Sequence, residues 1–136
     1  MKHAGGCLCG AVRFASTADA LDAGYCHCTL CQRSTGAPVL AWASYPAAAF
    51  TYTSGIPARY ASSDHGHREF CSRCGTQVAF VDSERTATVE VNVGSLDNRE
   101  SVHPRYHIWY RSRIGWFDTD DDLPRFDKSK PDDIAV

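Results

Sequence analysis

The chain has 136 residues, of which 43% are hydrophobic and 11% aromatic, and this is enough apolar material for the core of one domain. Its formal net charge is −2, and its basic residues nowhere cluster densely enough to form a nucleic-acid-binding arm. No segment approaches the roughly 20 consecutive apolar residues that cross a bilayer, so we expect neither a membrane nor a nucleic-acid partner.

The apolar and polar residues alternate in several short segments, a pattern typical of strands in a mainly β protein. In the first such segment Leu8, Val12 and Phe14 would share one face. A second clear case is residues 88–93, where three valines alternate with polar residues before Gly94. Shorter apolar runs of strand length follow the same rule, at residues 39–45, 50–53, 76–81 and 107–110.

Helical periodicity is weak throughout the chain. One short helical turn is predicted from Thr29 to Ser34, with Thr29 as the N-terminal cap and Gly36 ending it. The three tryptophans, at positions 42, 109 and 116, are expected to pack in the core.

The C-terminal end differs in composition from the rest of the chain. Residues 118–136 hold seven aspartates against three basic residues, and residues 124–136 also contain two prolines. We therefore predict a domain over residues 1–123, followed by an acidic tail over residues 124–136 that is poorly ordered or packed on the surface.

The cysteine content indicates a metal-binding protein of a reducing compartment. The first ten residues contain no apolar stretch of signal-peptide length, so we expect the protein to be cytoplasmic, where thiols stay reduced. There are seven cysteines, an odd number that cannot pair completely in disulfides. Their spacing must therefore indicate how they divide among metal sites.

Four of the cysteines form two tight pairs flanked by glycine. Cys7 and Cys9 make a C-x-C pair, and Cys71 and Cys74 make a C-x-x-C knuckle followed by Gly75. Tetrahedral zinc needs sulfurs within roughly 4 Å of one another, and both spacings allow this within one turn of chain. The four thiolates would saturate one zinc ion, so we predict a closed, structural site.

The remaining cysteines are Cys26, Cys28 and Cys31, which supply three sulfurs to a second ion. Three protein ligands and an open fourth position are the usual arrangement of a catalytic zinc. His27 lies between two of these ligands and should point away from the metal in an extended segment, which makes it a supporting or an exposed residue.

Two alternatives for the second site stay open. One is a closed site completed by a histidine from elsewhere in the chain, the candidates being His3, His65, His67, His103 and His107. The other is an iron–sulfur cluster, which would still need a fourth ligand. A c-type haem is excluded because Gln32, and not a histidine, follows Cys31.

Three thiolates change what a zinc ion does. They leave the complex with a charge of about −1, so the ion is a poorer Lewis acid toward water and a better partner for a soft sulfur donor. A substrate thiol bound there would lose its proton and could attack a carbonyl carbon. The predicted reaction is the reversible formation of a carbon–sulfur bond between a thiol and a small aldehyde.

Several spaced motifs of the sequence occur in the order found in one known family. The chain resembles the glutathione-dependent formaldehyde-activating enzymes, or GFA domains, which have an Mss4-like fold of several small antiparallel β-sheets. The likeness spans most of the chain and rests on these segments: GGCLCGAVR at 5–13, CHCTLCQR at 26–33 with Gly36 and Ala37, REFCSRCGT at 68–76, VGSLD at 93–97, HIW at 107–109, Trp116, and DDLP at 121–124.

The resemblance implies a zinc-binding domain over residues 1–123 with two zinc ions. Cys7, Cys9, Cys71 and Cys74 would hold the structural ion, and Cys26, Cys28 and Cys31 the catalytic or exchangeable one. It also implies a carbon–sulfur lyase that joins glutathione to formaldehyde as S-hydroxymethylglutathione, or cleaves that adduct.

Ten of the eleven basic residues before position 118 are arginines, whose planar guanidinium groups bind carboxylates in a two-pronged fashion. Arg33, directly after the trio, is the first candidate for binding the thiol cosubstrate, and Arg68, Arg105, Arg111 and Arg113 lie near other motifs. The rival interpretation is a non-catalytic zinc-binding interaction module, because a fold alone does not determine function.

Overall fold

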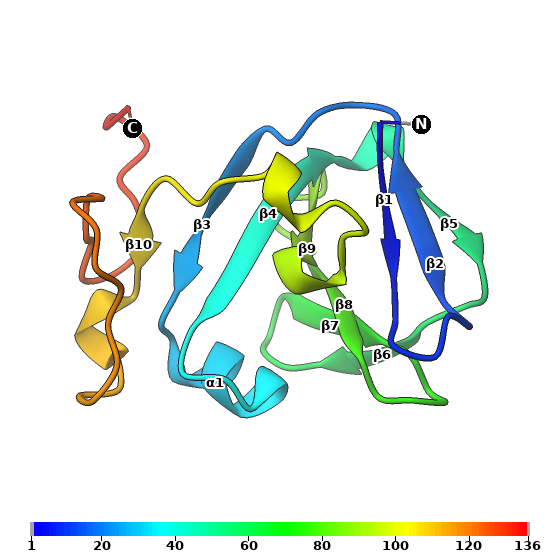
Figure 1. Ribbon diagram of the computed structural model, residues 1–136, viewed down its shortest axis with the longest axis horizontal. Helices are drawn as coiled ribbons and strands as arrows, with labels where there is room; N and C mark the ends of the chain where they lie inside the picture. The colour runs from blue at the N-terminus through cyan, green and yellow to red at the C-terminus, as the bar shows by residue number, and fades with distance from the viewer. Residues whose placement is uncertain (1, 136) are drawn as a thin grey trace.

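Residues 2–135 are described by a computed structural model, and within them ten strands form a three-stranded and a seven-stranded sheet (Figure 1). The small sheet has the order β1-β2-β5 and consists of β1 (His3–Gly6), β2 (Arg13–Ser16) and β5 (Phe50–Ser54). Both of its pairings are antiparallel. Met1 and Val136, the outer ends of the two ranges predicted from the sequence, lie outside the described residues.

The large sheet has the strand order β10-β3-β4-β9-β8-β7-β6. Its pairings are antiparallel except for β10 with β3, which is parallel. Its members are β3 (Asp22–Cys26), β4 (Leu40–Pro46), β6 (Ala58–Ala61), β7 (Gly66–Phe70), β8 (Gln77–Asp82), β9 (Thr88–Asn92) and β10 (His107–Ile108). The prediction of a mainly β fold of several small antiparallel sheets is therefore confirmed, apart from the parallel pairing of β10 with β3.

The two faces of the large sheet have different roles, because alternate residues of a strand point to opposite sides. On one face a row of cross-strand partners, Ala43, Val91 and Ala79, is fully buried in the main core together with Phe14 of the small sheet. The opposite face carries Trp42, which packs with the second group of cysteines. The main core thus joins the sheets, and the other face is left for the candidate site.

The single α-helix among the described residues, α1 (Thr29–Thr35), lies at the end of β3 and leads into β4 (Figure 1). Its N-terminal cap is Cys28, whose sulfur accepts a hydrogen bond from the backbone N–H of Cys31 at 3.2 Å. The predicted cap at Thr29 is therefore wrong by one residue. Gly36 ends the helix with a φ of 70°, as predicted.

The segment of residues 7–12, predicted as part of a strand, forms a tight turn between β1 and β2 instead. Gly10 adopts a φ of 81°, and its N–H donates to the carbonyl of Cys7. Leu8 is exposed at the tip of this turn. The alternation was misleading because the glycines let the chain fold back within the segment, and this brings the two cysteines of the turn together.

The later predicted strands at 39–45, 50–53, 76–81 and 88–93 correspond to β4, β5, β8 and β9, and the run at 107–110 shortens to the two residues of β10. The structure also contains short 3₁₀ helices: η1 (Ala47–Ala49), η2 (Val93–Ser95), η3 (Arg99–Ser101) and η4 (Tyr110–Ser112). Of the three tryptophans only Trp42 is buried, so the core placement predicted for Trp109 and Trp116 is wrong.

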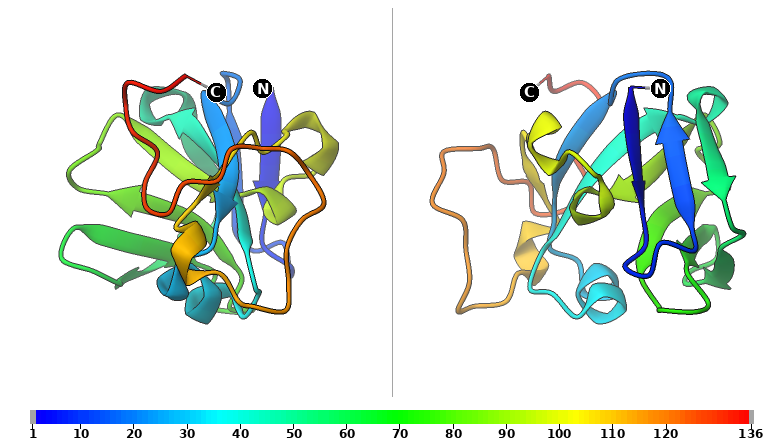
Figure 2. Two further views of the ribbon diagram at one scale, coloured as in Figure 1. Left: turned by 90° about the vertical axis from the view of Figure 1, so that its left-hand side faces the viewer. Right: turned by 45° about the vertical axis from the view of Figure 1, so that its right-hand side comes forward.

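The chain after η4 makes a wide loop and returns beside β10 (Figure 2). The backbone of Arg125 forms an isolated parallel β-bridge with that of His107, and the N–H of Phe126 donates to the carbonyl of His107 at 2.9 Å. The side chain of Phe126 packs edge-on against Tyr106. Residues 124–128 are thus attached to β10 and η4 by backbone hydrogen bonds. In residues 2–135 no helix has the length and apolar character needed to span a membrane.

Candidate metal centre

The first cysteine group, which we name the quartet, consists of Cys7, Cys9, Cys71 and Cys74 and is brought together by two turns. Cys7 and Cys9 come from the β1–β2 turn, and the other two from the β7–β8 turn. The sulfurs of Cys7 and Cys9 are 3.7 Å apart, and those of Cys9 and Cys71 are 3.8 Å apart. A tetrahedron with zinc–sulfur bonds of about 2.3 Å has edges of about 3.8 Å, so the four sulfurs fit one such ion.

Backbone N–H groups donate hydrogen bonds to sulfurs of the quartet. The N–H of Val12 donates to Cys7 Sγ at 3.3 Å, and the N–H of Arg73 donates to Cys71 Sγ at 3.4 Å. Gly75, with a φ of 80°, turns the chain after the second pair. All four ligand positions of an ion here would be filled by sulfur, as expected of a structural site.

The second group, which we name the trio, consists of Cys26, Cys28 and Cys31 at the junction of β3 and α1. The sulfur of Cys31 lies 3.0 Å from that of Cys28 and 3.4 Å from that of Cys26. Among the described residues, no histidine nitrogen joins this group at ligand distance. The structure therefore brings three candidate ligands together and supplies no fourth, which disfavours the closed site with a histidine.

The electrostatics of the trio favour one negative charge and oppose a second. Hydrogen bonding with Cys26 and Cys31 lowers the pKa of Cys28 to about 2. Hydrogen bonding with Cys28 and Cys31, together with burial, raises the pKa of Cys26. Three thiolates can therefore coexist only beside a cation, and this is the condition that a divalent metal ion meets.

Arg68, on β7, reaches the trio from across the sheet. It is only 7% exposed, and its Nη2 atom lies 3.9 Å from Cys31 Sγ. Its guanidinium also stacks over the ring of Phe80 at 5.2 Å. The sequence motif around Cys71 includes Arg68, but only the structure places this charge beside the other cysteine group.

His27, between two trio cysteines, faces away from the sulfurs as predicted, but it is buried and not exposed. Its Nε2 atom lies 2.8 Å from Nδ1 of His107. Nε2 of His107 in turn lies 3.3 Å from Oδ1 of Asp121, which accepts a hydrogen bond from Arg125 at 3.0 Å. The sequence indicated His107 only as a possible ligand, because the members of this hydrogen-bonded series are far apart in the sequence.

The imidazoles of His27 and His107 are both held in the neutral form. Burial lowers the pKa of His27 to about 4, with the neighbouring His107 contributing. Burial also lowers the pKa of His107, although Asp121 opposes this. The backbone carbonyl of His27 accepts a further hydrogen bond from the side chain of Gln32 at 2.8 Å. The segment that carries the trio is therefore fixed on both sides.

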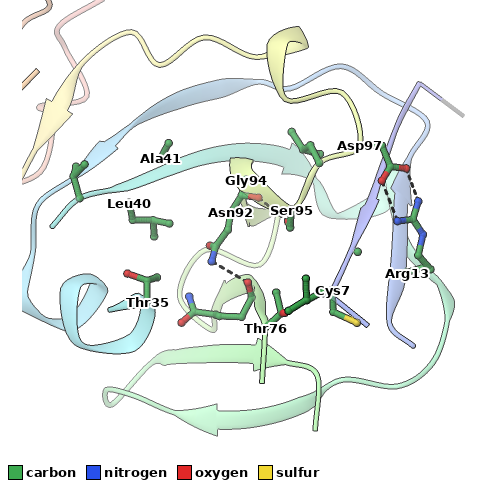
Figure 3. Close-up of a pocket in the computed structure, with 15 residues that line it drawn as sticks. Cys7, Arg13, Thr35, Leu40, Ala41, Thr76, Asn92, Gly94, Ser95 and Asp97 are labelled. Carbon is green, nitrogen blue, oxygen red and sulfur yellow. Dashed lines mark hydrogen bonds and ion pairs between the residues drawn. The ribbon is translucent and has the colours of Figure 1, made fainter. Parts of the chain in front are cut away.

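A pocket of about 570 Å³ lies between the quartet turn and the end of α1 (Figure 3). Leu40 and Thr35 form part of its wall, and Leu40 also packs against the trio as the cross-strand partner of Cys26. Asn92 and Ser95 add polar groups. Arg13 also lines this pocket, but it is already paired with Asp97. The pocket has the volume of a small-molecule site and shares a wall with the trio.

The candidate substrate-binding arginines have different environments. Arg33 is exposed in the last turn of α1, two residues after Cys31. Arg105 pairs with Asp22 at 3.1 Å, and Arg113 stacks over the ring of Tyr110 at 4.2 Å. The structure leaves Arg33 accessible on α1, and its role in substrate binding stays a prediction.

A third group of possible metal ligands, His65, Asp82 and Glu84, lies at the opposite end of the sheet. Nδ1 of His65 is 2.9 Å from Oδ1 of Asp82, and that same oxygen accepts a hydrogen bond from the N–H of Glu84. Asp82 raises the pKa of His65 through this hydrogen bond. An ion pair and a turn explain this cluster without a metal.

Both the fold and the sequence have counterparts among known proteins. A crystal structure of a Rhodobacter sphaeroides protein, solved in a structural genomics programme, superimposes with a TM-score of 0.59 and 27% sequence identity. The alignment covers 75% of this chain and 92% of that one. The family model described as glutathione-dependent formaldehyde-activating enzyme matches residues 2–112, which include both cysteine groups. The chain therefore belongs to the glutathione-dependent formaldehyde-activating enzyme family.

Proposed function

We propose that the protein is a zinc-dependent enzyme of the carbon–sulfur lyase type, which joins a thiol such as glutathione to a small aldehyde such as formaldehyde, or cleaves the adduct. The observation that carries the proposal is the trio, in which three buried or half-buried sulfurs converge without a fourth protein ligand among residues 2–135. Membership of the family supports the same pair of substrates.

In this proposal the two cysteine groups hold two zinc ions with different roles. Cys7, Cys9, Cys71 and Cys74 hold a structural ion, and Cys26, Cys28 and Cys31 hold the catalytic or exchangeable one. A zinc ion held by three thiolates would stabilise the thiolate form of an incoming thiol. The protein's contribution is to present the three sulfurs at the end of β3 and the start of α1, where His27, Gln32 and Arg68 hold them in place.

The proposed reaction is a reversible addition. The sulfur of the deprotonated thiol attacks the carbonyl carbon of the aldehyde, the carbon–sulfur bond forms, and the carbonyl oxygen receives one proton to become a hydroxyl. The reverse reaction returns that proton, breaks the carbon–sulfur bond and releases the aldehyde. No oxidant or reductant is consumed.

The pocket beside the trio offers a place for the remainder of the thiol. Its volume of about 570 Å³ and its mixture of Leu40 with Asn92 and Ser95 suit a small, polar molecule. We further propose that Arg33 binds a carboxylate of the thiol cosubstrate, because it is exposed in the last turn of α1, the helix that carries Cys31.

The test combines zinc content with product formation. Purified protein is analysed for zinc and incubated with glutathione and ¹³C-labelled formaldehyde, and the S-hydroxymethyl carbon is followed by NMR. We expect about two zinc ions per chain, and faster formation and exchange of the adduct than in buffer. A protein whose second zinc neither exchanges nor binds glutathione, and which leaves the uncatalysed rate unchanged, would be an interaction module instead.

A further inference from the structure

Arg68 carries a buried positive charge that forms no ion pair with a carboxylate of residues 2–135. Its side chain is 7% exposed, and its polar partners are Ser62 Oγ, at 3.2 Å from Nε, and Cys31 Sγ, at 3.9 Å from Nη2. In the part of the chain that the structure describes, Arg68 forms no ion pair. Glu69, the next residue on β7, is paired with Arg59 of β6 instead. A buried charge without a counter-charge is costly, so its natural partner is an anion at the trio.

The position of Arg68 on the sheet is well determined. Phe80 on β8 is its cross-strand partner, and the guanidinium lies over that ring. Glu90 on β9 is the next residue of the same row, but it is not within ion-pair distance of Arg68. The guanidinium therefore contacts a trio sulfur and not the nearest carboxylate of its row. A purely structural arginine on this face would be expected to pair with that carboxylate.

The charges at the trio explain why this arrangement is useful. A divalent ion with three thiolates has a formal charge of about −1, and a thiolate in the fourth position would bring it to about −2 inside a largely buried site. The guanidinium of Arg68 cancels one of these charges. A neutral fourth ligand, such as imidazole, would add no charge and would not need the arginine.

We infer that Arg68 determines the charge class of the fourth ligand, making the trio selective for anionic donors such as thiolates over neutral donors. The inference rests on the proposed function, in which the trio holds a metal ion with an open position, and it deepens that proposal by naming the residue that makes thiolate binding favourable. Arg68 acts here as a specificity residue through its contact with Cys31.

The experiment measures ligand binding to the cobalt-substituted protein by its visible absorption. Three probes are used: 2-mercaptoethanol as a thiolate, azide as a small anion without sulfur, and imidazole as a neutral donor. The variants are Arg68→Gln, which removes the charge, and Arg68→Lys, which keeps a charge but not the planar fork. Arg85→Gln is the matched control, since Arg85 is an exposed arginine in the turn between β8 and β9.

We expect Arg68→Gln to weaken the binding of 2-mercaptoethanol and of azide by about ten-fold or more, the scale of a lost charge-assisted contact, and to change imidazole binding by less than about two-fold. Arg68→Lys should be intermediate, and Arg85→Gln should match the wild type. Circular dichroism and cobalt content establish that each variant is folded and loaded. If Arg68→Gln does not fold, the affinities of Arg68→Lys and the wild type for the anionic probes and for imidazole are compared instead, and this comparison tests the role of Arg68.

The possible failures are distinguishable. Equal loss of all three probes, or no loss of the anions, would overturn the role of Arg68 while leaving the proposed enzyme intact. A wild-type protein that binds azide but no thiol would overturn the proposed function, and the anion-to-imidazole ratio in the variants would still decide the inference. A wild-type protein that binds imidazole and neither anion would overturn both.

Discussion

His27 and His107 are joined by a buried contact of 2.8 Å between Nε2 of the first and Nδ1 of the second. The contact connects the segment between two trio cysteines to β10, and through Asp121 to the C-terminal segment. That segment lies beyond residue 112, where the family match ends. Residues outside the matched region therefore help to fix the trio.

Replacing His107 by phenylalanine should weaken metal binding at the trio without affecting the quartet. The change leaves His27 without its buried partner, and loss of the groups that orient a ligand segment typically lowers metal affinity by about ten-fold to a hundred-fold. Zinc release to a graded series of chelators measures both sites. His103→Phe, an exposed histidine on the same segment, serves as the control and should release zinc as the wild type does. Equal weakening of both zinc sites in His107→Phe would contradict the assignment.

The two cysteine groups should respond differently to loss of one sulfur. Cys74→Ser opens the quartet, which joins the β1–β2 and β7–β8 turns and includes core residues Cys7 and Cys71, so the domain should unfold. Cys28→Ser removes a half-buried trio sulfur, and the protein should stay folded with about one zinc ion instead of about two. Zinc analysis and circular dichroism check both variants. The same loss of structure in both would show that the groups are not divided in this way.

The stability of the protein should depend on pH through Glu90. Burial raises the pKa of Glu90 from 4.5 to about 7, the charges of Arg85 and Arg68 oppose this, and those of Asp82 and Asp22 add to it. The pKa of Glu90 is higher in the folded state than in the unfolded state. Its contribution to the free energy of unfolding is therefore fully present below pH 4.5 and is lost as the pH rises to 7.

The variant Glu90→Gln should therefore unfold at higher denaturant concentration than the wild type at pH 8, with a gain of about 1–3 kcal/mol in the free energy of unfolding. The gain should shrink as the pH falls from 7 toward 4.5. Urea titrations at several pH values measure it, and Glu100→Gln, at an exposed position, should show no such trend. A gain that does not change with pH would mean that ionisation of Glu90 is not its cause.

Gly5 should not tolerate a side chain. A Cβ atom built there would clash with the backbone oxygen of Ser95 and lie 2.7 Å from the ring of Phe14, which is buried in the main core. Gly5→Ala should reduce the free energy of unfolding by about 1–3 kcal/mol, the scale of overpacking. Gly94→Ala, where a Cβ would meet nothing within 4 Å, should be close to neutral. Chemical denaturation of the two variants makes the comparison, and equal effects would contradict it.

The sequence by itself determined the features that depend on short-range spacing. The division of seven cysteines into a quartet and a trio could be predicted because the ligands within each pair or triplet are at most five residues apart in sequence. The alternation of Val89, Val91 and Val93 likewise predicted β9, because a strand with one buried face has apolar residues at every second position. It failed over residues 7–12, where Gly10 allows a turn that side-chain pattern alone does not distinguish from a strand.

Only the tertiary structure decided what surrounds the trio. Arg68 lies beside Cys31 although 37 residues separate them, and His107 lies beside His27 although 80 residues separate them. Both contacts depend on the order of the strands in the large sheet, including the parallel pairing of β10 with β3. Hydrophobic periodicity indicates which face of a strand is buried, but it carries no information about which strands become neighbours. The charge and the buried histidine that act on the trio therefore became visible only once the chain was folded.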